Sequence, residues 1–281
     1  MSAINDDAAG PLLPSDPGDR SVVARDPWQS LRQYTAARIA LGRSGSSLPT
    51  REVLDFGLAH AQARDAVHLP LDVAALQSQL QADGWDVIAL TSRAADRAAY
   101  LARPDWGRRL HDDALPLLDA ARSATAPRID ADDVAFDVAF VVSDGLSSTA
   151  VQCHAAPLLQ ALRPLMADLR IAPIVIATQA RVALSDEVGQ RLQARIAVSL
   201  IGERPGLSSP DSLGAYLTYA PRVGNTDEVR NCISNIRPQG LVLTQAAQQI
   251  AALLRAALQA QRSGVALRFD PSTIAAIRSD S

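Results

Sequence analysis

The sequence contains no lysine, so all 27 of its Lys and Arg residues are arginine. Without lysine the chain has no Schiff-base amine, no P-loop lysine and no attachment point for pyridoxal phosphate. A genome rich in G+C explains the replacement most simply, although guanidinium also suits protein interfaces because it desolvates more readily than ammonium. The absence of lysine therefore excludes three kinds of enzyme chemistry.

Metal-ligand and membrane patterns are also missing. The two cysteines, Cys153 and Cys232, form no CxxC motif, and the four histidines have no HExxH or related spacing. No apolar run reaches the length of a membrane span, and the N-terminus lacks the pattern of a secretory signal. We therefore expect a cytoplasmic protein in a reducing compartment, without a metal site and without membrane contact.

The charge balance excludes another class of partner. The net charge is −3, so no basic surface for a nucleic-acid backbone is expected. Hydrophobic residues make up 48% of the 281 residues, which is ample for one large core or two small ones. The composition indicates a globular protein that does not bind nucleic acid.

Three regions are expected along the chain. Residues 1–26 are rich in Asp, Pro, Gly and Ser and predict a flexible arm. Residues 27–130 predict mainly helices, one of them over 28–39 and another beginning near Thr50, with a short strand at 87–90. An acidic stretch at 124–133 marks the expected boundary with the third region, residues 131–281.

The third region alternates between strand and helix patterns. Apolar runs at 136–142, 174–177 and 196–201 have the length of buried strands, and helical patterns separate them. A well-marked helix at 244–262 follows. Such alternation predicts an α/β fold with a doubly wound parallel sheet, preceded by the smaller helical region.

The stretch from the third strand to Ile236 is where we expect a ligand. The run ends in Gly202-Glu-Arg-Pro-Gly206, and the residues that follow are dense in Ser, Gly, Pro and Tyr, which predicts a polar loop. Open α/β sheets bind ligands at the carboxyl ends of their strands. Glu203 therefore either accepts hydrogen bonds from a ligand or pairs with the neighbouring Arg204, and its position favours the first interpretation.

Three further positions have open interpretations. Ser143-Asp-Gly-Leu-Ser-Ser148 joins a strand to a helix, where it either caps the helix or holds an anion. Val182 follows the second strand and is either a core residue or a contact of a ligand lying across the sheet edge. Cys232 is interpreted as a contact residue, since no base near it in the sequence supports a nucleophile. No catalytic set is complete, and the residues alone predict a cytosolic α/β ligand-binding protein.

Five segments together resemble one enzyme family. They are residues 35–45 (TAARIALGRSG), 100–110 (YLARPDWGRRL), 142–148 (VSDGLSS), 200–207 (LIGERPGL) and 231–236 (NCISNI). Their order and identity are similar to those of the small (light) subunit of ethanolamine ammonia-lyase. The resemblance covers about residues 28–264, and it does not include the arm before Asp26.

The resemblance implies a lyase that converts ethanolamine to acetaldehyde and ammonia by a radical mechanism with adenosylcobalamin. It implies that a large subunit binds the substrate, and that this chain covers the cobalamin with a Rossmann-like domain through Val182, Glu203 and Cys232. It also implies a higher-order oligomer of large–small pairs, in the cytoplasm or within a bacterial microcompartment. The chain has no Asp-x-His-x-x-Gly motif, which is compatible with a cofactor that keeps its own base on cobalt. The alternative is a stand-alone α/β protein that binds a nucleotide or phosphorylated metabolite at Ser143-Asp-Gly145.

Overall fold

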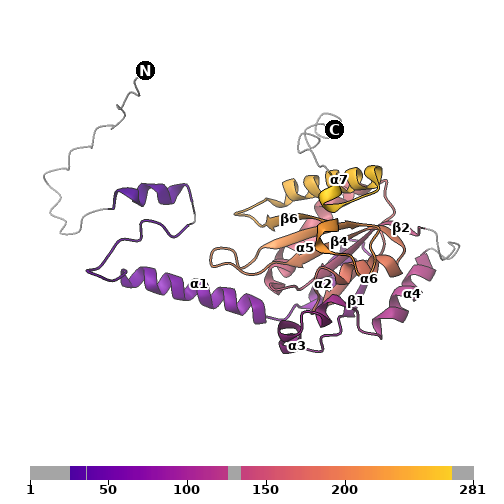
Figure 1. Ribbon diagram of the computed structural model, residues 1–281, viewed down its shortest axis with the longest axis horizontal. Helices are drawn as coiled ribbons and strands as arrows, with labels where there is room; N and C mark the ends of the chain where they lie inside the picture. Colours follow the sequence, from indigo (N-terminus) through magenta and orange to yellow (C-terminus); the bar gives the residue numbers. More distant parts are fainter. Residues whose placement is uncertain (1–25, 36, 126–133, 268–281) are drawn as a thin grey trace, which may run out of the picture. The chain divides into compact units, whose positions relative to one another are not determined.

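Six strands form one sheet in the computed structural model, which describes residues 26–35, 37–125 and 134–267 (Figure 1). Their spatial order is β1-β3-β2-β4-β5-β6. Their bounds are β1 Val87–Thr91, β2 Phe136–Ser143, β3 Ile174–Thr178, β4 Ala194–Gly202, β5 Leu213–Tyr219 and β6 Arg230–Ile236. Strands β1 to β4 run parallel, whereas β5 is antiparallel to both β4 and β6. The α/β class is confirmed, but the expectation of a purely parallel sheet is wrong for the last two strands.

Helices cover both faces of this sheet. The α-helices of the described chain are α1 Thr50–His68, α2 Val73–Ala82, α3 Arg97–Ala102, α4 Ala114–Thr125, α5 Ser148–Leu162, α6 Leu184–Arg191 and α7 Leu243–Ala260. Short 3₁₀ helices lie at Pro27–Gln33, Trp106–Arg108, Arg163–Met166, Asp227–Val229 and Gly264–Ala266. Helices α2, α5 and α7 share one core cluster with the sheet, and α4 and α6 share the other.

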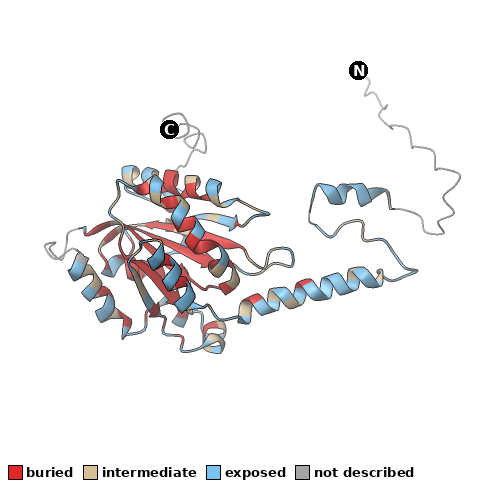
Figure 2. Cartoon of the chain, turned by 180° about the vertical axis from the view of Figure 1, so that it is seen from behind, coloured by how far each residue is buried: buried red, intermediate tan, exposed pale blue. Residues whose placement is uncertain are grey.

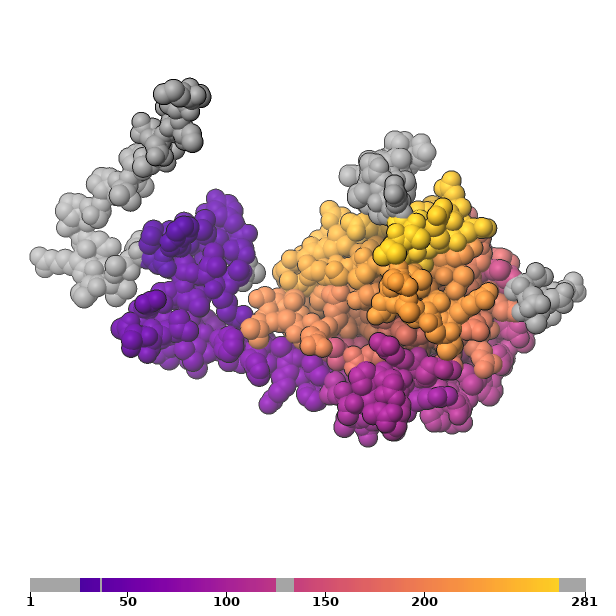
Figure 3. Space-filling model, in the orientation of Figure 1, coloured from indigo at the N-terminus to yellow at the C-terminus, as the bar shows by residue number. Residues whose placement is uncertain are grey.

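The two cores follow from the side-chain alternation of the strands. In β2, Val138 and Phe140 belong to the cluster with α5 and α7, whereas Ala139 and Val141 belong to the cluster with α4 and α6. Strands β2, β3 and β4 are buried between helices whose outer faces are exposed (Figure 2). The space-filling view shows the segment 243–267, coloured yellow, on the outside of this part of the chain (Figure 3). A strand buried on both faces reads as a continuous apolar run, which is why β2, β3 and β4 were predictable from the sequence.

The chain changes direction between β2 and β4. After β2 it passes through α5 to β3 on one side, and after β3 it passes through α6 to β4 on the other side of β2. Strands β2 and β4 are therefore neighbours, but the chain leaves them in opposite directions, from β2 towards β3 and from β4 towards β5. In open α/β sheets such a point leaves a crevice at the carboxyl ends of the strands, and ligands bind there.

The prediction of a polar loop after Gly202 is wrong for two stretches and stands for 203–212 and most of 220–229. Residues 213–219 and 230–236 are strands β5 and β6, which extend the sheet beyond β4. The outer strand β6 alternates between half-buried and exposed residues. Because an edge strand bonds to one neighbour and buries little surface, polar residues such as Asn231 and Ser234 are tolerated in it.

The chain divides into two compact units, residues 1–55 and 56–281. In the described part of the first unit, the helix expected over 28–39 is only the 3₁₀ helix Pro27–Gln33, and Arg32 pairs with Glu52 at 3.3 Å. The expected arm, residues 1–26, lies outside the described residues except for Asp26. The expected boundary between 130 and 131 also lies outside them, and β1, which precedes it, pairs with β3 in the sheet of the second unit.

Candidate functional site

Two adjoining hollows lie at the carboxyl edge of the parallel strands, with volumes of about 290 and 420 Å³. Arg181, Val182 and Tyr216 line both. The first is also lined by Pro104, Arg108, Ala183, Asp227, Arg230 and Cys232, and the second by Tyr100, Gly145, Leu146, Ile201, Gly202, Glu203 and Arg204. The structure thus places Val182, Glu203 and Cys232 along one surface formed by two hollows that share three residues.

Val182 follows β3 in a turn that is fixed by Asp144. The Asp144 carboxylate accepts hydrogen bonds from the backbone N–H groups of Gln179 at 2.9 Å and Ala180 at 3.1 Å. Burial raises the pKa of Asp144, and these hydrogen bonds oppose the rise. Asp144 is therefore a structural group that ties the end of β2 to the turn after β3. Val182 is half-buried at the surface of both hollows rather than enclosed in the core.

The hydroxyl groups that follow Asp144 also have internal partners. Ser147 caps α5 by accepting from the N–H of Ala150 at 3.2 Å, and its hydroxyl donates to the carbonyl of Pro210 at 2.7 Å. The Ser148 hydroxyl donates to the carbonyl of Leu69 at 2.5 Å. These contacts match the capping interpretation of the segment and leave Ser147 and Ser148 little capacity to hold an anion.

Two glycines bring β4 against the turn after β2. A Cβ on Gly145 would lie 2.2 Å from the carbonyl oxygen of Gly202, and a Cβ on Gly202 would lie 2.0 Å from that of Ser147. The N–H of Leu146 donates to the Gly202 oxygen at 2.9 Å. Any side chain at either position would separate these backbones. The close contact places Leu146 and Glu203 side by side in the wall of the second hollow.

Glu203 lies directly after β4 and is held by one of its two carboxylate oxygens. Oε2 accepts from the Ser212 hydroxyl at 2.5 Å and from the backbone N–H of Asn235 at 3.2 Å. Within the described residues Oε1 has no hydrogen-bond donor, and Glu203 forms no ion pair with Arg204. The carboxylate is thus fixed on one side and retains an acceptor on the other.

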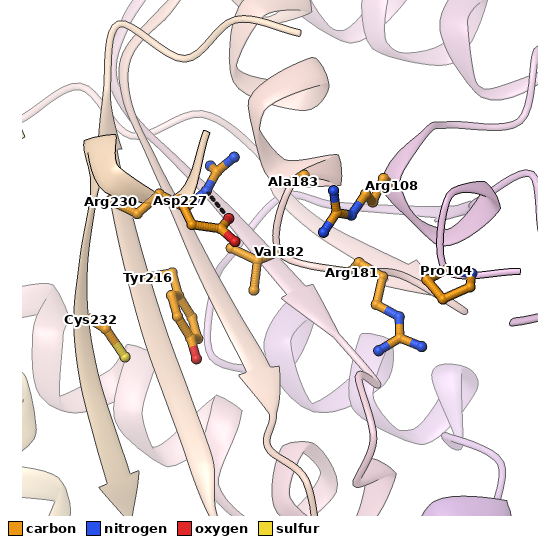
Figure 4. Close-up of a pocket in the computed structure, with 9 residues that line it drawn as sticks. All are labelled: Pro104, Arg108, Arg181, Val182, Ala183, Tyr216, Asp227, Arg230 and Cys232. Atoms are coloured by element: carbon orange, nitrogen blue, oxygen red, sulfur yellow. Dashed lines mark hydrogen bonds and ion pairs between the residues drawn. The ribbon is translucent and has the colours of Figure 1, made fainter. Parts of the chain in front are cut away.

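Tyr216 and Cys232 are directly opposite each other on β5 and β6 (Figure 4). Burial raises the pKa of the Cys232 thiol, and the nearby Glu203 carboxylate adds to the rise, while a hydrogen bond with Tyr216 lowers it. Burial also raises the pKa of Tyr216. Cys232 is exposed to solvent, although its surroundings partly desolvate the thiol. A thiol with a raised pKa is neutral near pH 7 and is therefore a weak nucleophile. These features fit the interpretation of Cys232 as a contact residue.

Arg181 and the segment around Tyr100 complete the wall, and the sequence did not identify them as site residues. The Arg181 guanidinium lies 4.2 Å from the centre of the buried Tyr100 ring, and its backbone N–H donates to the carbonyl of Gly107 at 2.7 Å. Arg109 then forms two hydrogen bonds of 3.0 Å with Glu187 on α6. These contacts attach the segment 100–110 to the sheet edge. The density of Arg in that segment was the feature of the sequence that could have indicated a site here.

A buried ion pair supports the far side of the first hollow. The Arg230 guanidinium lies 2.7 Å from both carboxylate oxygens of Asp186, and the two side chains are 2% and 1% exposed. Arg230 also donates to the Thr218 hydroxyl at 3.0 Å and to the Asn225 carbonyl at 3.1 Å. The pair joins α6 to the start of β6, close to Cys232. The sequence did not predict this pair because its two residues are far apart in the chain.

Burial raises the pKa of Tyr100 to about 12 from an ordinary value of 10.0. The unfolded chain therefore loses this proton at a lower pH than the folded chain, and stability falls as the pH rises above 10. From Tyr100 alone, the free energy of unfolding is expected to be about 1.4 kcal/mol lower at pH 11 than at pH 9. Urea titrations at both pH values are expected to show this loss in the wild type and a smaller loss in Tyr100→Phe. Equal losses in the two proteins would contradict the assignment.

Metal-ligand clusters and membrane-spanning helices are both missing from the described residues. No group of three or more His, Cys, Asp or Glu side chains in these parts of the chain is arranged to hold a metal ion. None of the helices described here combines the length and apolar character needed to cross a membrane.

The fold is that of an α/β protein with two adjoining hollows at the carboxyl edge of the parallel strands in a mixed sheet. A model of the ethanolamine ammonia-lyase light chain (EutC) family matches residues 25–268. Similar proteins named ethanolamine ammonia-lyase small subunit occur in Ralstonia nicotianae (54% identity; 88% of this chain and 90% of the relative) and in Azotobacter vinelandii (53%; 89% and 91%). Another, from Xanthomonas campestris pv. campestris, is 54% identical over 87% of this chain and 88% of the relative. The chain belongs to the ethanolamine ammonia-lyase light chain family.

Proposed function

We propose that the chain is the small subunit of an adenosylcobalamin-dependent ethanolamine ammonia-lyase, which converts ethanolamine to acetaldehyde and ammonia. In this proposal it binds no substrate, and it holds cobalamin against the large subunit through Val182, Glu203 and Cys232. The observation that carries the proposal is that these three residues, from three separate segments, meet at the two adjoining hollows.

The side chains at this edge suit the chemistry of a corrin ring. A corrin carries amide side chains whose N–H groups need acceptors, and Glu203 has a fixed carboxylate with Oε1 still available. Val182 and Tyr216 offer apolar surface between the hollows. When bound, the cofactor would supply the radical chemistry, whereas these residues orient it and exclude water.

The size of the hollows supports a shared cofactor. Volumes of about 290 and 420 Å³ suit parts of a ligand, and a corrin with its side chains is larger than either. A second protein surface is then needed to enclose it, which is the role proposed for the large subunit. Exposed apolar side chains in the first unit, such as Trp28, Tyr34 and Leu48, offer surface for such a partner. Further large–small pairs would build the higher-order oligomer.

The parallel part of the sheet supports a Rossmann-like description. Strands β2, β3 and β4 with α5 and α6 form the crossover units, and the proposed cofactor lies where their direction changes. The domain from residue 131 onward would cover the cofactor, and the mainly helical region 27–130 precedes it in the chain.

A cytoplasmic location, free or within a bacterial microcompartment, is proposed for the complex. Both cysteines are free and exposed, which fits a reducing environment.

Co-expression tests the proposal. The chain and its large partner are produced together and separately, and ethanolamine turnover is measured with added adenosylcobalamin. Turnover and a cobalamin absorption spectrum on the purified complex are expected only when both chains are present. A large subunit that is active alone, with the same affinity for the cofactor, would overturn the proposal.

A further inference from the structure

A third hollow, of about 730 Å³, lies at the opposite edge of the parallel strands. It is formed where β4 begins and where β5 and α6 end, so it is separate from the proposed cofactor site. Four arginines line it, and we refer to it as the arginine hollow: Arg122, Arg191, Arg195 and Arg222. No acidic side chain is among the described residues that line it.

Among the described residues, carboxylates lie close to two of these four charges. Arg191 lies 3.4 Å from Asp119, and Arg195 lies 3.6 Å from Asp137. Within the described chain, Arg122 and Arg222 have no carboxylate partner, so the arginine hollow has about two uncompensated positive charges.

Arg122 shows the imbalance most directly. Its Nη1 donates to the side-chain oxygen of Gln193 at 2.9 Å, but its Nε is buried and donates to none of the described residues. A buried donor without an acceptor destabilises the folded protein. An oxygen from a bound anion would satisfy it.

Helix dipoles account for only part of the cluster. Arg122 and Arg191 lie in the last turns of α4 and α6, where a cation interacts favourably with the helix end. Arg195 is on β4 and Arg222 is in the segment after β5, so neither is explained in this way. The backbone that lines the arginine hollow also adopts an uncommon conformation at three residues. Gln193, Ala220 and Gln261 all have positive φ angles near 50°.

We propose that the arginine hollow binds a small molecule that bears a phosphate or diphosphate group. The planar guanidinium fork matches phosphate oxygens, and several forks around one hollow can bind a multiply charged anion from different sides. Gln190 and Gln261 line the same hollow and offer neutral amides to the rest of the ligand.

Inorganic pyrophosphate is the probe, and citrate is the comparison anion without phosphorus. Binding is measured calorimetrically in a phosphate-free buffer of low ionic strength, on the full-length chain co-purified with its large subunit. Pyrophosphate is expected to bind with a Kd below about 1 mM, and citrate at least about tenfold more weakly. Arg122→Gln and Arg222→Gln are each expected to weaken pyrophosphate binding by about tenfold or more.

Arg255→Gln provides the matched control, because Arg255 is exposed on α7, pairs with Asp168 and does not line the hollow. It should leave pyrophosphate binding unchanged, and Glu203→Gln should do the same because it lies at the other edge of the sheet. Thermal unfolding of each variant identifies those that fail to fold. Equal pyrophosphate affinities in the wild type and the folded Arg222→Gln variant would overturn the proposal, as would citrate binding as tight as pyrophosphate. Neither result depends on whether cobalamin binds.

Discussion

Replacing Asp186 by alanine is expected to lower the free energy of unfolding by about 3–5 kcal/mol. The variant leaves the guanidinium of Arg230 buried without its main counter-charge, since both side chains of the pair are almost fully enclosed. Arg230 would retain the Thr218 hydroxyl and the largely exposed Asp227, which replace only part of the lost interaction. Urea unfolding of the purified protein, followed by circular dichroism, measures the change.

Asp168→Ala is the control for this prediction. Asp168 also bonds to both terminal nitrogens of an arginine, Arg255, at 3.0 and 2.8 Å, but that pair lies at the surface. Solvent screens surface pairs of this kind, so Asp168→Ala is expected to lower the free energy of unfolding much less than Asp186→Ala. If Asp168→Ala and Asp186→Ala destabilise the protein equally, burial is not what makes the Asp186–Arg230 pair important.

The second large effect is expected on cofactor binding, from Glu203→Gln. The side-chain oxygen of the glutamine can still accept from Ser212 and Asn235, so the local structure is retained. Its NH₂ group then takes the place of Oε1 and presents donors where the wild type presents an acceptor. Because amide N–H groups of a corrin would meet a donor instead of a carboxylate, we expect the cobalamin affinity of the large–small complex to fall by about 10- to 100-fold.

Spectroscopic titration with cobalamin measures that affinity, and urea unfolding checks that stability changes by less than about 1 kcal/mol. Glu228→Gln is the matched control, since Glu228 is exposed, accepts from Thr226 and lines neither of the two hollows. Unchanged cobalamin affinity in a folded Glu203→Gln variant would restrict Glu203 to a structural role.

The central strands could be predicted because they are buried on both faces. Apolar runs such as Ile174–Ala177 need no partner to be recognised, and the bounds of β3 differ from the prediction by one residue. Strands β5 and β6 could not be recognised in this way. Their Gly214, Thr218, Asn231 and Ser234 resemble loop residues. Their strand conformation depends on the pairing of β5 with β4 and of β6 with β5, which the local sequence does not encode.

The site could be predicted only in part for the same reason. Glu203 was identifiable because it follows a buried strand, and a carboxylate after Gly202 has a clear physical meaning. Val182 and Cys232 are ordinary residues that become candidates through the family resemblance, and the fold then brings them to the same edge of the sheet as Glu203. The Asp186–Arg230 pair joins groups 44 residues apart, so it depends on tertiary structure.

The most direct test of the proposed site is the reactivity of Cys232 towards iodoacetamide in the large–small complex, with and without cobalamin. Cys153, which is also free and exposed, provides the control within the same molecule. At a cobalamin concentration of about ten times its Kd, alkylation of Cys232 should slow by roughly tenfold while that of Cys153 does not change, as peptide mass spectrometry can measure. Equal alkylation of Cys232 with and without cobalamin, while the absorption spectrum shows the cofactor bound, would contradict a cofactor at this edge of the sheet.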